Sequence, residues 1–480
     1  MVPRRSVFPH LLRALLLAAL LALAACGGAT RQVVEEAMDM AAATLTAEAE
    51  QPQATAAPAE AEATATTDES AAISTEAPAV APTEAAAPAE AVAAVVISDQ
   101  GFGQDDTTVG YAFVVSNPNA ATGFENIEYQ VAILDAAGTV VATDSGYINV
   151  LFAGETQGVG GALFVDSGAT VSTLTVQVSG GDAVASDPVA GFTVEGGQYI
   201  PGDFGNQATG IVVSPFGRAF DDLRVSAVAY DAAGTIVGGG FTFVNFVPAN
   251  GRTGVTVQVT AAGEVAEVAL YPALSALSFL DSDDELPADG QALELLSQGV
   301  GSGEFGSGFG ILVRNPNTGY ALENSRYRIT AFDAAGNVVA TDEGYIEVLL
   351  PGQTLGIGGS LFAAGDAPIA TTEALVKAGD FVASDSTAIF TTENVAYVPG
   401  DFSSEVTGTV INPHDAEVSD LRVSAVAYDA ADQIIGGGFT FLDFVPAAGS
   451  AAVSVPVTTN GEPARVELYA ALSALSQVGD

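Results

Sequence analysis

The chain is poor in the residues on which much binding and catalytic chemistry depends. Its 480 residues include one Cys, two His, no Trp and 13 Lys+Arg against 58 Asp+Glu, which gives a formal charge of −45. A single Cys excludes an internal disulfide and a zinc site built from cysteines. Phosphate contacts need clustered Lys and Arg, so nucleic acid is not an expected partner. Two His leave little material for histidine-based catalysis.

Apolar residues, in contrast, are plentiful. They make up 49% of the chain, enough to build hydrophobic cores, so the chain is not expected to be disordered throughout. The length corresponds to about three or four domains at ~100–200 residues each.

The first 25 residues have the pattern of a targeting signal. Arg4 and Arg5 precede an apolar run, Leu11–Ala25, that is interrupted only by Arg13 and is shorter than the ~20 residues of a membrane span. The run ends in Leu23-Ala24-Ala25-Cys26-Gly27, which resembles a bacterial lipobox. The resemblance implies cleavage before Cys26, acylation of its thiol, and anchoring on the extracytoplasmic face of a bacterial membrane. An ordinary secretory signal with an incidental Cys is the alternative.

Residues 26–95 are expected to form a disordered tether. From about residue 41 onward they are mostly Ala, Thr, Glu and Pro, with almost no large apolar side chains to form a core. Repeated Pro also prevents one long helix. The tether is either a spacer that lifts the folded part off the membrane or a linker without a selected length.

The rest of the chain is a duplicated pair of modules. Gly110–Phe164 matches Gly308–Phe362, and Gly197–Ser278 matches Ala396–Ser476, both at a shift of about 198 residues. The two members of each pair share fainter marks: a Pro near the first strand, then an Asp, then a Gly-aromatic pair. We therefore expect modules A (96–195) and B (196–278), an acidic linker (279–296), and modules A′ (297–394) and B′ (395–480).

Each module has the pattern of a β-sandwich, so the predicted fold class is all-β. Ile127, Tyr129, Val131 and Ile133 alternate with Glu128, Gln130 and Ala132, as in a half-buried strand. The following Asp135-Ala136-Ala137-Gly138 suits a tight turn, because Asp caps its own backbone and Gly accepts positive φ. Short strands and turns that recur every ~8–12 residues predict a small sandwich in each module.

These motifs resemble the FxLYD-type bacterial immunoglobulin-like module. The resemblance rests on the Asn-Pro start, on the alternating strand that ends in an aromatic-Asp pair, and on the later Pro351-Gly352. The aromatic-Asp pair stands at Tyr230-Asp231, Phe332-Asp333 and Tyr428-Asp429. The resemblance implies four tandem seven-stranded immunoglobulin-like sandwiches and no catalytic residues.

Carboxylates are the main candidates for site chemistry, because calcium sites and glycosidases need only these groups. The densest run is Asp281, Asp283, Asp284 and Glu285, either a calcium site between modules or a solvated linker. Asp105-Asp106 is a weaker version of the same pattern. Asp135, Asp231, Asp333 and Asp429 recur in every module, which favours an architectural role.

Three other features are given structural interpretations. Gly301–Gly306 matches a dinucleotide fingerprint by letters, but the chain continues as a strand, so we expect a Gly-rich loop. His414 is expected to lie on a surface turn. Phe241 and Phe243, with Phe439 and Phe441, are interpreted as core residues, and a carbohydrate platform is the alternative.

The sequence thus predicts a lipid-anchored, non-catalytic, extracytoplasmic protein that displays tandem β-sandwiches for adhesion, scaffolding or envelope-ligand binding. Its expected partners are the membrane, through the lipid, and an unidentified envelope or extracellular protein or glycan. No cofactor is expected beyond the covalent lipid at Cys26. A calcium-stiffened rod and a carboxylate-based glycan hydrolase are the alternatives.

Overall fold

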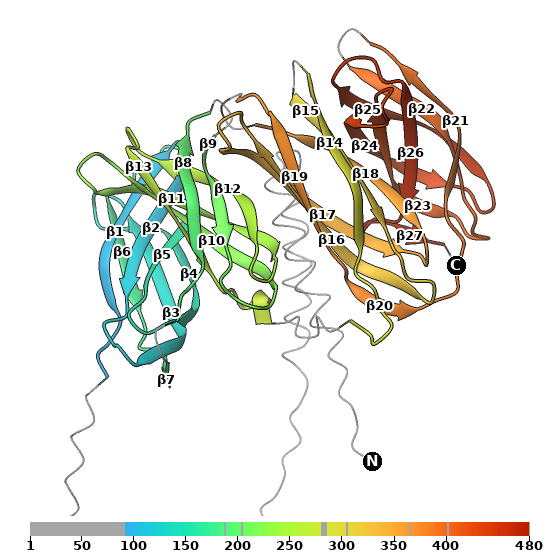
Figure 1. Cartoon of the computed structure of the whole chain (residues 1–480). Helices are drawn as coiled ribbons and strands as arrows, with labels where there is room; N and C mark the ends of the chain where they lie inside the picture. The colour runs from blue at the N-terminus through green and yellow to red at the C-terminus, as the bar shows by residue number, and fades with distance from the viewer. Residues whose placement is uncertain are drawn as a thin grey trace, which may run out of the picture. The chain divides into compact units, whose positions relative to one another are not determined.

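A computed structural model (Figure 1) describes residues 92–186, 189–202, 205–279, 286–303, 306–363, 365, 367–400 and 403–479. These residues fall within one compact unit, Pro88–Asp480. They are almost entirely β, and the one helical element among them is the short 3-10 helix η1 (Leu277–Phe279). The predicted all-β class and the repeated sandwich-like units are confirmed.

Module A is a sandwich of two antiparallel sheets. One sheet has the order β1-β2-β5, and in the other β3 pairs with β4 on one side and with β6 and β7 in succession on the other. Its strands are β1 (Val96–Asp105), β2 (Thr108–Ser116), β3 (Thr122–Leu134), β4 (Val140–Leu151), β5 (Thr156–Phe164), β6 (Thr173–Val178) and β7 (Asp182–Ala185).

Module B has two sheets joined at a single point. The order is β13-β10-β11-β12-β9-β8, and β11 meets β12 only through Gly238 and Gly239. Its strands are β8 (Thr193–Ile200), β9 (Asn206–Val213), β10 (Phe220–Tyr230), β11 (Ile236–Val247), β12 (Arg252–Ala261) and β13 (Glu267–Ala273).

Modules A′ and B′ repeat these two topologies. The first strands β8, β14 and β21 begin three or four residues before the boundaries expected from the sequence at 196, 297 and 395. Module A′ contains β14 (Glu294–Gly303), β15 (Gly306–Arg314), β16 (Tyr320–Phe332), β17 (Val338–Leu349), β18 (Thr354–Leu361), β19 (Thr371–Lys377) and β20 (Asp380–Ala383). Module B′ contains β21 (Thr391–Val398), β22 (Ser404–Ile411), β23 (Val418–Tyr428), β24 (Ile434–Val445), β25 (Ser450–Thr459), β26 (Arg465–Ala471) and the short β27 (Gln477–Val478), which pairs with β23.

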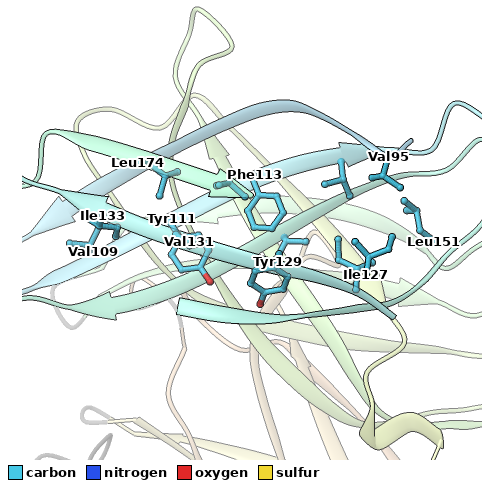
Figure 2. Packing of buried hydrophobic residues seen from close by; sticks show 14 of the residues in the cluster. Val95, Val109, Tyr111, Phe113, Ile127, Tyr129, Val131, Ile133, Leu151 and Leu174 are labelled. Atoms are coloured by element: carbon cyan, nitrogen blue, oxygen red, sulfur yellow. The ribbon is translucent and has the colours of Figure 1, made fainter. Parts of the chain in front are cut away.

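Each sandwich closes over its own hydrophobic core. In module A the alternate residues of β3 that were predicted to face inward do so, and Val131 and Ile133 are fully buried. Figure 2 shows Tyr129 and Val131 beside Tyr111 and Phe113 of β2 in this core. Phe113 and Tyr129 meet edge to face with ring centroids 5.3 Å apart. The period-two pattern therefore locates the core, because alternate side chains of a strand share one face.

Buried asparagines close one end of three of the sandwiches. In module A the Nδ2 of Asn117 donates to the carbonyls of Thr122 and Phe152, both at 2.8 Å. Asn315 and Asn412 make the same kind of bonds in modules A′ and B′. These are the Asn of the Asn-Pro pairs. Their amides satisfy strand-end carbonyls that would otherwise be buried without a donor.

Candidate functional site

Two groups of predicted site residues lie outside the described residues. They are the lipobox residues Leu23, Ala24, Ala25, Cys26 and Gly27, and the candidate calcium ligands Asp281, Asp283, Asp284 and Glu285. Both therefore remain sequence-based hypotheses. Within the described ranges, no group of three or more His, Cys, Asp or Glu side chains is placed to hold a metal ion. That part of the chain also contains no helix with the length and apolar character needed to cross a membrane.

The aspartates that recur in every module hold turns. Oδ1 of Asp231 accepts hydrogen bonds from the backbone N–H groups of Ala233 and Thr235, both at 2.9 Å. The same pair of bonds is made by the other three. Asp333 accepts one further bond, from Nδ2 of Asn337 at 2.9 Å, and this bond together with the backbone bonds lowers the pKa of its carboxyl. Their role in the described structure is to shape the turn between two strands.

Asp106, Gly303 and His414 also lie in turns or hairpins. Asp106 takes a left-handed φ of 49° between β1 and β2. Gly303 ends β14, and β15 begins at Gly306, so a hairpin stands where a dinucleotide site would need a helix. The backbone N–H of His414 donates to Oδ1 of Asn412, and its ring packs edge to face on Phe390 at 5.3 Å.

The interpretation of Phe241 and Phe243 as core residues is wrong. Their exposed fractions are 38% and 37%, and that of Phe441 is 40%, whereas Phe439 is half-buried. Each Phe pair is perpendicular, with centroids 5.8 Å apart, and the guanidinium of Arg224 lies 4.0 Å from the Phe241 centroid. The alternation predicts that the two rings share a face, but not that solvent reaches that face. Perpendicular rings do not form a flat platform for a sugar.

Modules A and B pack against each other through glycine-rich sheets. A Cβ at Gly110 would overlap the carbonyl oxygen of Thr260, and one at Gly160 would overlap that of Gly240. The sheets therefore approach backbone to backbone, and Ala112, Val114 and Ile236 fill the space between them. This explains why β2 is buried on both faces, since every residue from Val109 to Val115 is buried. The triple glycine of β11 provides close contact, not flexibility.

The duplicated pair A′–B′ uses the same packing. A Cβ at Gly358 would overlap the carbonyl oxygen of Gly438, just as at Gly160 and Gly240. An arginine bridges each pair: Nη2 of Arg224 donates to the Gly160 carbonyl at 2.7 Å, and Nη2 of Arg422 donates to the Gly358 carbonyl at 2.8 Å. Each pair of modules is therefore joined through a continuous packed interface.

A carboxylate lies close to the bridging arginine of the second pair. Burial raises the pKa of Asp342 on β17 to about 6, and the positive charge of Arg422 opposes this shift. Burial also raises the pKa of the nearby Tyr327 hydroxyl. In the first pair the hydroxyl of Tyr111 donates to Asp144, the counterpart of Asp342. Two buried titratable groups with raised pKa values, Asp342 and Tyr327, therefore lie near Arg422 at the A′–B′ interface.

A different, charged contact joins module B to module A′. The Arg328 guanidinium donates to the carbonyl of Gly254, from Nε at 3.0 Å and from Nη2 at 2.6 Å, and also pairs with Glu343. The side chain of Arg328 is 3% exposed, and burial lowers the pKa of its guanidinium while Glu343 acts in the opposite direction. The N–H of Gly254 donates to Oγ1 of Thr330 at 3.2 Å. We call this contact the B–A′ junction.

Acids of module B bind further cations of module A′ at the same junction. Nζ of Lys377 donates to Oδ2 of Asp221 at 2.6 Å, and Asp221 is only 5% exposed. Arg326 contacts Oδ2 of Asp222 at 3.3 Å and donates to the carbonyl of Asn245 at 2.5 Å. Buried charges are tolerated only when paired, so this register of the two modules is specific.

The sequence carried a signal for this junction that periodicity does not reveal. Arg326, Arg328 and Lys377 of module A′ stand where module A has Glu128, Gln130 and Ser179. A comparison of the duplicated copies therefore marks the positions at which one copy gained a contact.

Comparisons of the chain with models of known protein families and with curated protein sequences give no match to either.

Proposed function

We propose that the chain is a non-catalytic, lipid-anchored protein of a bacterial envelope whose β-sandwich modules form a scaffold that displays binding surfaces. The lipobox-like Leu23–Gly27 supports the anchor, and the Ala/Thr/Glu/Pro-rich segment that follows supports a spacer role. Extracytoplasmic display is consistent with both features.

The observation that carries the scaffold role is how the scarce cations are used. Arg224, Arg326, Arg328, Lys377 and Arg422 all make contacts between modules. Side chains that would serve an active site in an enzyme here fix the position of one sandwich against the next. This use favours a protein whose work is to hold surfaces in a fixed arrangement.

The anchor is tested by expressing the chain and its Cys26→Ser variant in a bacterial host. The parent should incorporate labelled fatty acid and sediment with membranes, and the variant should do neither. Retention of the variant in the membrane fraction would contradict the lipid anchor.

Binding is tested separately with purified residues 26–480 carrying Cys26→Ser. Immobilised protein is exposed to envelope extracts and to cell-wall glycans, with the same protein heat-denatured as the control. Saturable binding by the folded form alone supports the display role. Absence of binding to extracts, glycans and the chain itself would contradict it.

A further inference from the structure

The face of module B that forms the B–A′ junction has an uncovered counterpart on module B′. In module B, Phe246 is 2% exposed and Gly254 is buried, whereas the equivalent Phe444 is 54% exposed and Ala452 is exposed. We use the term B′ face for Phe444, Asp443, Ala452 and Ser454, with Asp420 at its edge. The duplication thus left module B′ with a surface of the kind that binds a β-sandwich in module B.

The B′ face adjoins a shallow groove of about 450 Å³. Thr407 and Gly408 of β22 and Ala452 and Ser454 of β25 line it. The equivalent place in module B is where Gly254 exchanges hydrogen bonds with Arg328 and Thr330. The position that receives an arginine in module B is therefore uncovered in module B′, although the Cβ of Ala452 occupies the space that Thr330 fills beside Gly254.

Charge specifies what this face can bind. Asp420 keeps the carboxylate that Asp222 offers to Arg326. Ser419 replaces the Asp221 that binds Lys377, and Asp443 supplies a second carboxylate where module B has Asn245. A cationic surface is therefore the complement of the B′ face.

A second copy of the chain lacks that complement. The surface of module A that corresponds to the docking surface of module A′ carries Glu128, Gln130 and Ser179 in place of Arg326, Arg328 and Lys377. Head-to-tail contact would bring Glu128 toward Asp420, and like charges oppose such a contact. The replacements also limit open-ended polymerisation, which a repeated head-to-tail contact would otherwise allow.

We propose that the B′ face is a docking surface for a protein partner that presents Arg and Lys side chains from a β-sheet, as module A′ presents them to module B. The exposed ring of Phe444 supplies the apolar contact, and Asp420 and Asp443 supply the charge complement. This inference rests on the binding role proposed above, but its test uses neither the lipid nor the envelope, so the two can fail separately.

The test uses residues 26–480 with Cys26→Ser as the target and a charge-grafted form of the same chain as the probe. In the probe, module A receives the charged junction residues of module A′, namely the counterparts of Arg326, Arg328, Glu343 and Lys377, and its own B′ face is blocked. The substitutions are Glu128→Arg, Gln130→Arg, Ser145→Glu, Ser179→Lys and Phe444→Arg. Circular dichroism and thermal melting first establish that the probe is folded.

Sedimentation velocity at low salt should show a one-to-one complex of target and probe that weakens as salt screens the charges. Phe444→Arg in the target should weaken binding by about tenfold or more, since it places a cation against the grafted cations. Phe362→Arg is the matched control: Phe362 is 74% exposed on module A′ and should leave binding unchanged.

Two outcomes would overturn the proposal. A folded probe and target that remain monomers at low salt would show that the B′ face does not accept a cationic sheet. Self-association of the ungrafted target through Phe444 would instead identify a second copy of the chain as the occupant.

Discussion

Arg328 of module A′ donates two hydrogen bonds to one carbonyl oxygen, that of Gly254 in module B. We expect Arg328→Met to destabilise the chain by about 3 kcal/mol, because the carbonyl loses both donors and Glu343 loses its partner. Glu343 is 35% exposed, so water compensates part of the loss. Calorimetry should show a lower melting temperature for the transition that includes the B–A′ junction.

The control is Gln130→Met in module A. Gln130 is exposed at the equivalent strand position, so its replacement should leave the melting profile unchanged. Equal effects of the two substitutions would show that the junction contributes nothing beyond the intrinsic preference of a strand for each residue.

Replacing a glycine at the interface between paired modules should destabilise the chain even when the new residue is alanine. In Gly160→Ala or Gly358→Ala the added methyl would overlap the carbonyl of Gly240 or Gly438, which forces the two sheets apart. We expect a cost of about 1–3 kcal/mol for each, typical of overpacking. Hydrogen exchange should accelerate in β2, β5, β10 and β11 of the first variant.

Gly180→Ala provides the comparison, because a Cβ at Gly180 would meet no atom within 4 Å. Its exchange rates should match those of the parent chain. Unchanged exchange in Gly160→Ala as well would contradict backbone-to-backbone packing of modules A and B.

The recurring aspartates should matter for stability through their acceptor oxygens. Asp231→Ala removes the acceptor for two backbone N–H groups and should cost about 1–2 kcal/mol. Asp231→Asn keeps an acceptor oxygen and should cost less. Urea titration checks the order, and an equal loss in both variants would argue against the hydrogen-bonded turn.

The strands and turns could be predicted from the sequence because their causes are local. The alternation at Ile127–Ile133 lies within β3, and Asp135 occupies the predicted turn. The burial of β2 on both faces could not be predicted in this way, since it depends on a second sheet that is distant in sequence. The prediction that Phe241 lies in the core was wrong for the same reason. Periodicity tells which residues share a face, but not what covers that face.

The B–A′ junction could be predicted from the sequence only in part. Its individual contacts can be identified only from the structure, because residues such as Lys377 and Asp221 are 156 positions apart in the sequence. Its location can nevertheless be inferred from the sequence. Module A′ has Arg326 and Arg328 at positions where the duplicated module A has Glu128 and Gln130. The proposed lipid attachment at Cys26 rests on sequence alone.

Asp342 should make stability depend on pH in a defined direction. Its pKa rises from an ordinary value near 3.8 to about 6 because the carboxyl is buried at the A′–B′ interface. Between pH 3.8 and pH 6 the Asp342 carboxyl is protonated in a larger fraction of folded chains than of unfolded chains. The contribution of this group to the free energy of unfolding is therefore full below about pH 4, falls as the pH rises toward 6, and then stays constant.

Asp342→Asn removes this dependence, since the amide does not ionise. The variant should gain stability relative to the parent as the pH rises from 4 to 6, and the gain should persist at pH 7. Glu462→Gln, which replaces an exposed carboxyl, is the matched control. Urea titrations at each pH measure the effect. Parallel profiles for the parent and Asp342→Asn would show that folding leaves the pKa of this carboxyl unchanged, which would require the interface to be wetter than its burial implies.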